Sequence, residues 1–84
     1  MDLVINILRF IDSAMDKEAF PADIFTGKNF HVSDERFFKT VQALSEDGYI
    51  SGVSIKYSVG MGFIMSLSNV RLTVSGMRLL EEKK

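Results

Sequence analysis

The sequence predicts an α+β fold that is mostly helical, with a β-hairpin placed before the last helix. Two observations lead to this prediction. Apolar residues recur at helical spacing in residues 2–16, 33–48 and 74–82. Between residues 49 and 73 the apolar period changes to two, which is typical of strands with one covered face.

Composition limits the classes of protein to consider. Eighty-four residues with 46% apolar and 25% charged content indicate one small globular domain over residues 1–84. The lack of cysteine excludes disulfides and thiolate metal sites and fits a reducing compartment. A net charge of -1 is unlike that of a dedicated nucleic-acid binder, although a local basic patch stays open.

Residues 2–16 are expected to form the first helix, with apolar side chains over most of its circumference. Such a helix must be covered on more than one side, so we interpret it as a core helix, with a subunit interface as the alternative. Asp2 stands where a signal peptide needs a base, and Arg9 and Asp12 interrupt the run, so we expect a cytoplasmic protein without membrane attachment. The expected stripe consists of Val4, Ile7, Leu8, Ile11 and Met15, with Leu3, Ile5 and Phe10 outside it.

Residues 17–32 are expected to be irregular. Pro21 suits the first turn of a short helix over residues 21–25, and Thr26 and Gly27 end it. Lys28 and Asn29 are then expected in a loop, with Phe30 folded under the domain. His31 is the only histidine and has no second ligand at metal spacing and no nucleophile beside it, so we expect no metal, no cofactor and no enzymatic activity.

The clearest helix lies between Ser33 and Gly48. The Ser33 hydroxyl can accept from the first-turn amides, acids follow at positions 34 and 35, and Gly48 can adopt the left-handed conformation that ends a helix. Val32 and Phe37 can form a hydrophobic staple. The predicted core face is Phe37, Val41 and Leu44, widened by Phe38.

Two alternating runs, residues 49–57 and 63–73, are expected to pair as a hairpin around the turn at residues 59–62. Ser68 and Asn69 are expected to form a bulge or kink. The two glycines of the turn do not form a phosphate loop, because no complete motif is present. Thr73 should cap the last helix, residues 74–82, which is expected to bury Met77 and Leu80 and to pack closely at Gly76.

This order of elements is that of a winged helix-turn-helix, with a three-helix core, a hairpin wing and a C-terminal helix. The capped helix runs into Glu-Asp-Gly-Tyr-Ile at residues 46–50, and Leu-Thr-Val-Ser-Gly at residues 72–76 leads into the last helix. In these motifs the chain resembles the YjcQ-like family of small winged-helix proteins from bacteria and prophages. The resemblance implies the fold and a phage-related origin, and little about activity.

If the protein binds double-stranded DNA, the capped helix is expected to enter the major groove. The candidate contacts are Lys28, Ser33, Arg36, Lys39, Thr40 and Lys56. Against this, residues 33–48 hold two bases and four acids, and the turn of the hairpin is apolar. DNA binding ranks first only because this fold is so often used that way.

The alternative is a protein-interaction or assembly module. Apolar and methionine side chains gather on the hairpin, and methionine suits adaptable contact surfaces. The candidate interface residues are Met61, Phe63, Ile64 and Met65. Together with the broad apolar surface of the first helix, they lead us to expect a homodimer at micromolar or higher concentration.

Overall fold

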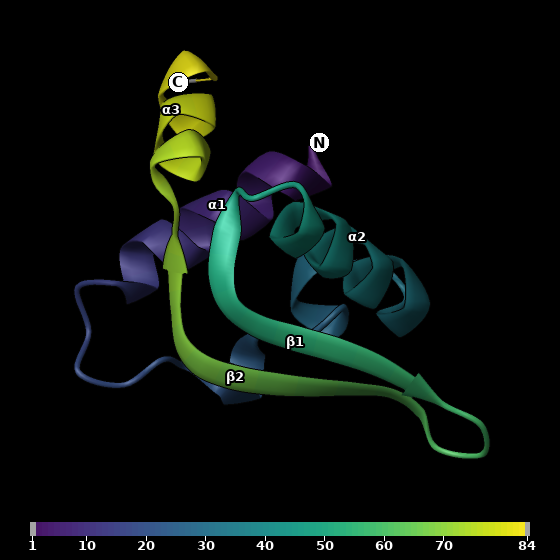
Figure 1. Cartoon of the computed structure of the whole chain (residues 1–84). Helices are drawn as coiled ribbons and strands as arrows, with labels where there is room; N and C mark the ends of the chain where they lie inside the picture. Colours follow the sequence, from purple (N-terminus) through teal and green to yellow (C-terminus); the bar gives the residue numbers. More distant parts are fainter. Residues whose placement is uncertain (1, 84) are drawn as a thin grey trace.

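A computed structural model describes residues 2–83 and shows three α-helices and one antiparallel hairpin (Figure 1). The helices are α1 (Leu3–Ala14), α2 (Asp34–Glu46) and α3 (Val74–Glu82), and the strands are β1 (Ile50–Ser58) and β2 (Gly62–Leu72). This mostly helical α+β arrangement is consistent with a winged helix-turn-helix and confirms the predicted fold class.

Helix α1 is the core helix that its apolar surface predicts. The Asp2 carboxylate caps it by accepting from the Val4 amide at 2.9 Å. Ile7, Leu8 and Ile11 are fully buried, and Ile5 is buried as well. The predicted burial of Met15 is wrong: the helix ends at Ala14, and the Met15 side chain turns toward β2, 37% exposed, where its sulfur accepts from the Leu72 amide at 3.4 Å.

The segment between α1 and α2 contains two single 3-10 turns, Ala22–Ile24 and Lys28–Phe30, which corrects two expectations. The first replaces the short helix predicted at residues 21–25, and the second replaces the loop predicted at Lys28 and Asn29. Phe25 directly follows the first turn, and Phe30 ends the second. Phe25 is 1% exposed, and its ring centroid lies 5.0 Å from that of Phe37. The rings of Phe10, Phe20 and Phe30 surround it.

Helix α2 begins and ends as predicted. The Ser33 hydroxyl accepts from the Arg36 amide at 3.2 Å. At the other end Gly48 has φ +80°, and the amides of Gly48 and Tyr49 donate to the carbonyls of Ser45 and Leu44, as in a Schellman motif. The predicted core face is confirmed, since Phe37, Val41 and Leu44 are all buried.

The hairpin is long and bent (Figure 1). Its inner face packs on α2 through Phe63, whose ring lies 5.4 Å from that of Phe38. The predicted bulge is confirmed: the register shifts between Ser51 and Val53, and Asn69 adopts a left-handed φ of +56°. Opposite the bulge, Gly52 has φ +85°, and a Cβ there would come within 2.6 Å of the Asn69 carbonyl oxygen.

Helix α3 has the predicted bounds, and the Thr73 hydroxyl accepts from the Gly76 amide at 3.1 Å. The same hydroxyl donates to the Gly48 carbonyl, which ties the start of α3 to the end of α2. Leu80 is buried as predicted. The predicted burial of Met77 is wrong, because α3 contacts the body by one narrow side and leaves Met77 41% exposed.

Candidate nucleic-acid interface

The outward surface of α2 carries charges of both signs. Glu35, Lys39 and Glu46 lie along its exposed side. Toward α1 and α3, a shallow hollow of about 440 Å³ runs beside the helix. Its lining is apolar at Val4, Leu44, Tyr49 and Leu79 and polar at Arg36, Lys39, Thr40 and Asp47.

Three of the predicted DNA contacts on α2 already have partners within the fold. The Ser33 hydroxyl accepts from the Arg36 amide, and the Thr40 hydroxyl donates to the Arg36 carbonyl at 2.8 Å. The Lys39 ammonium lies 3.0 Å from the Glu35 carboxylate, both well exposed. An exposed pair of this kind is worth only about 0–1 kcal/mol, so Lys39 can still be drawn to a phosphate.

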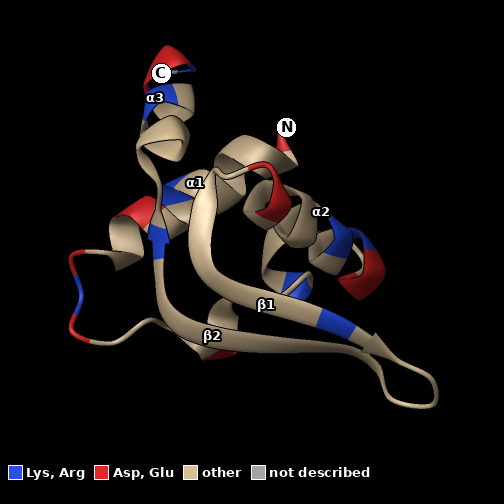
Figure 2. Ribbon diagram, viewed as in Figure 1, with Lys and Arg blue, Asp and Glu red and all other residues tan. Residues whose placement is uncertain are grey.

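The other three candidates are exposed and come from different elements. Lys28 lies in the second 3-10 turn, Arg36 in the first turns of α2, and Lys56 on β1. Each is exposed, and the one ion pair found within residues 2–83 includes none of them. Figure 2 shows the bases of α2 next to the acids at its start and a blue segment on β1, where Lys56 is the base in the sequence.

The outer face of the hairpin, opposite the core, is the surface that residue-by-residue prediction missed. The strand register places Ser54 across from Ser66 and Lys56 across from Ile64, all four exposed. Nearer the body the Arg71 guanidinium donates to the Ser51 hydroxyl at 3.4 Å. No acid occurs from residue 48 to residue 80, although the chain has eleven. The sequence alone shows this feature as a long stretch without Asp or Glu.

The four candidate protein-interface residues do not form one surface. Phe63 and Met65 lie on the inner face and pack against the core cluster or the α2 aromatics. Ile64 lies on the outer face, 41% exposed, and Met61 is in the turn, 75% exposed. Whether any of the four contacts a partner stays a prediction.

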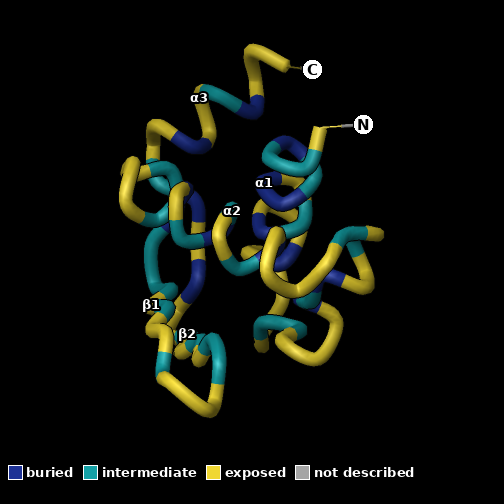
Figure 3. Tube along the Cα trace, turned by 90° about the vertical axis from the view of Figure 1, so that its right-hand side faces the viewer, coloured by how far each residue is buried: buried dark blue, intermediate teal, exposed yellow. Residues whose placement is uncertain are grey.

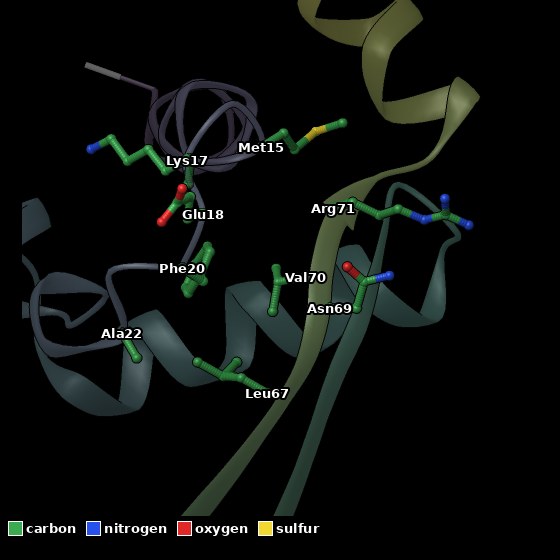
Figure 4. A pocket seen from close by; sticks show the side chains of 10 residues that line it. Met15, Lys17, Glu18, Phe20, Ala22, Leu67, Asn69, Val70 and Arg71 are labelled. Carbon is green, nitrogen blue, oxygen red and sulfur yellow. The ribbon is translucent and has the colours of Figure 1, made fainter.

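A second hollow, of about 530 Å³, lies between the end of α1 and the bulged part of β2 (Figure 4). Phe20, Leu67, Val70, Lys17 and Arg71 are among the residues that line it, and the charged ends of Lys17 and Arg71 point away from its centre. Within residues 2–83 no cluster of three potential metal ligands is found, and no helix there is long and apolar enough to cross a membrane.

Comparison with known proteins identifies a family for the chain. The model of a family described as YjcQ protein matches residues 5–84, nearly the whole chain. No curated protein and no solved structure matches the chain.

Proposed function

This chain belongs to the YjcQ protein family, and we propose that it binds double-stranded DNA through α2 and the outer face of its hairpin. In this proposal the protein is a small cytoplasmic regulator with no enzymatic activity. The phage-related origin implied by the resemblance is part of the same proposal.

The main observation behind the proposal is that the acids of the chain all lie outside the hairpin. The hairpin, Ile50–Leu72, has two bases and no acid, and its outer face adds several serines that can donate to phosphate oxygens. A surface that approaches a polyanion gains from bases and loses from every acid. The hairpin is therefore better suited to DNA than the net charge of the whole chain suggests.

Helix α2 contributes by its position in the fold rather than by its charge. Like the recognition helix of a winged helix-turn-helix, it directly precedes the hairpin. The ion pair found within residues 2–83 does not include Arg36, so this side chain can reach phosphate or guanine. Asp34 and Glu35 oppose the phosphates at the end of the helix that enters the groove. We therefore expect modest affinity and shallow salt dependence, with about four neutralised phosphates giving a log–log slope near -3.6.

Fluorescence anisotropy with a labelled duplex at low and physiological salt tests the proposal. Lys56→Glu should weaken binding to all sequences alike and make the salt slope shallower by about one unit. The matched control is Arg9→Glu, the same kind of change at an exposed position of α1, which should leave binding nearly unchanged. An absence of binding at both salt concentrations would remove DNA as the ligand.

A second candidate function is association with a protein, including a second copy of the chain. It is favoured by one observation: the end of the hairpin exposes Tyr57, Val59 and Met61 at 68%, 93% and 75%. The first helix no longer supports this candidate, because its apolar side chains are largely covered within the fold. Sedimentation at several concentrations tests it, and Met61→Ser should then reduce the associated fraction.

A further inference from the structure

The end of the hairpin is a narrow apolar projection. Residues 59–61, called here the hairpin tip, lie beyond the last strand pair, Ser58 with Gly62. Figure 1 shows the turn of the hairpin extending past the helices, and Figure 3 colours it as exposed. Val59 and Met61 are 93% and 75% exposed, so neither side chain contributes much to the core.

We propose that the hairpin tip inserts Val59 and Met61 as a wedge between base pairs from the minor groove of DNA and kinks the duplex. This inference rests on the proposed DNA binding and adds a role for two residues outside the predicted DNA contacts, of which Met61 is predicted only as a candidate for a protein interface. Minor-groove proteins insert apolar side chains of this kind between base steps and bend DNA by roughly 20–90°.

The tip is small enough to act as a wedge. The Met61 amide donates to the Ser58 carbonyl at 3.1 Å, which closes a tight turn. Gly60 occupies the third position of this turn with φ +91°, a conformation that suits glycine there. Only two side chains therefore project at the end, and both are apolar and uncharged.

One positive charge and two hydroxyls lie behind the tip, and all three suit a phosphate backbone. Lys56 lies on the outer face two residues before Ser58, and the exposed hydroxyls of Ser54 and Ser66 follow on the same face. These groups can bind the phosphates on either side of an opened base step. No acid lies anywhere on the hairpin to repel them.

The hairpin is also anchored to α2, by ring packing near the tip and by a hydrogen bond nearer the body. The Phe63 ring lies between those of Phe38 and Tyr57, at 5.4 and 5.3 Å. Nearer the body, the Ser45 hydroxyl of α2 donates to the Val53 carbonyl at 3.3 Å. A rigid ribbon keeps the tip at a set angle to α2, which insertion requires.

The exposed apolar residues near the tip fit a wedge better than a protein-binding surface. Tyr57 lies on the inner face, Ile64 on the outer face, and Val59 and Met61 at the end between them. They do not form one flat patch, whereas a stable protein interface covers about 800 Å² on each partner. Association of the tip with a protein is therefore an opposing outcome of the test below.

The test uses a duplex with 2-aminopurine at a central TpA step and a donor–acceptor pair at its ends. Binding is measured separately by anisotropy. On saturation with the wild-type chain, 2-aminopurine fluorescence should rise as the step unstacks, and energy transfer should report a bend of roughly 20–90°. The double variant Val59→Ser/Met61→Ser should lose both signals while its affinity falls by no more than about tenfold, since phosphate contacts supply most of the affinity.

The control is Met77→Ser, the same change at an exposed methionine of α3, which should retain both signals.

Binding by the wild-type chain without unstacking or bending would overturn the wedge and leave the proposed function standing. Signals that persist in the double variant would also overturn it. If the chain does not bind the duplex at either salt concentration, the proposed function fails first and the wedge with it. A tip that instead mediates protein association would leave the fluorescence unchanged whether or not the duplex is bound, which also counts against the wedge.

Discussion

Replacing Gly76 by alanine should lower the stability of the protein, although a glycine-to-alanine substitution inside a helix usually raises it. In an unobstructed helix the change stabilises by about 1 kcal/mol, because alanine has the higher helix propensity. Gly76 lies in the first turn of α3, where an added Cβ would collide with the Tyr49 carbonyl oxygen and come within 3.1 Å of the carbonyl carbon. The obstacle is backbone, so no rotamer change can remove it.

The magnitude follows from what must move. Overpacking of this kind costs about 1–3 kcal/mol, and a rigid backbone obstacle places Gly76 at the upper end. A shift of α3 would also weaken the 3.0 Å hydrogen bond from the Thr73 amide to the Tyr49 carbonyl, worth about 1 kcal/mol. After subtracting the propensity gain, we expect a net loss of about 2–3 kcal/mol, a large part of the ~4–12 kcal/mol available to a chain of this length.

Urea unfolding followed by circular dichroism measures this loss. The matched control is Ser75→Ala at the neighbouring, exposed position of the same helix, which should be neutral or slightly stabilising. If Gly76→Ala proves as stable as the wild type, the close approach of α3 to Tyr49 is wrong.

Three further predictions address the core, the bulge and the acids of α2. Leu44→Ala, at a buried position, should lower stability by roughly 2–5 kcal/mol, and an unchanged urea midpoint would refute the assigned core face. Asn69→Ala should cost about 1 kcal/mol because φ is +56° there, whereas Asn69→Gly should not, as thermal unfolding can show. Replacing Asp34 and Glu35 by alanine should strengthen duplex binding in anisotropy, because it removes repulsion and frees Lys39; unchanged binding would place α2 outside the interface.

The ends of α2 and α3 were predictable because local chemistry determines them. Ser33, Gly48 and Thr73 each satisfy backbone groups within a few residues, so no tertiary information is needed. Burial was predictable only in part. Periodicity identifies which face of a helix is covered. It does not show how far along the helix the neighbouring elements continue to cover that face. Met15 and Met77 lie where this cover ends, and both are exposed.

The segment before α2 and the candidate site were the hardest to predict. Of the four phenylalanines around Phe25, one comes from α1, two come from the irregular segment between α1 and α2, and one comes from α2. Their clustering therefore depends on tertiary packing and leaves no period in the sequence. For the site, pairing across the hairpin decides that Lys56 shares a face with serines and that Phe63 and Met65 turn inward. The sequence shows a stretch without acids, but only the strand register shows that this stretch forms one hairpin with a polar outer face.

The most direct test of the proposed interface is a nuclear magnetic resonance titration of the ¹⁵N-labelled chain with a short duplex. The amide signals that move should cluster in the first turns of α2, around Arg36, and on the hairpin, from Ser54 to Ser66 and including the tip. Signals of the exposed side of α1, such as Arg9, should stay in place. Shifts confined to α1 and α3, or no shifts at low salt, would contradict the account.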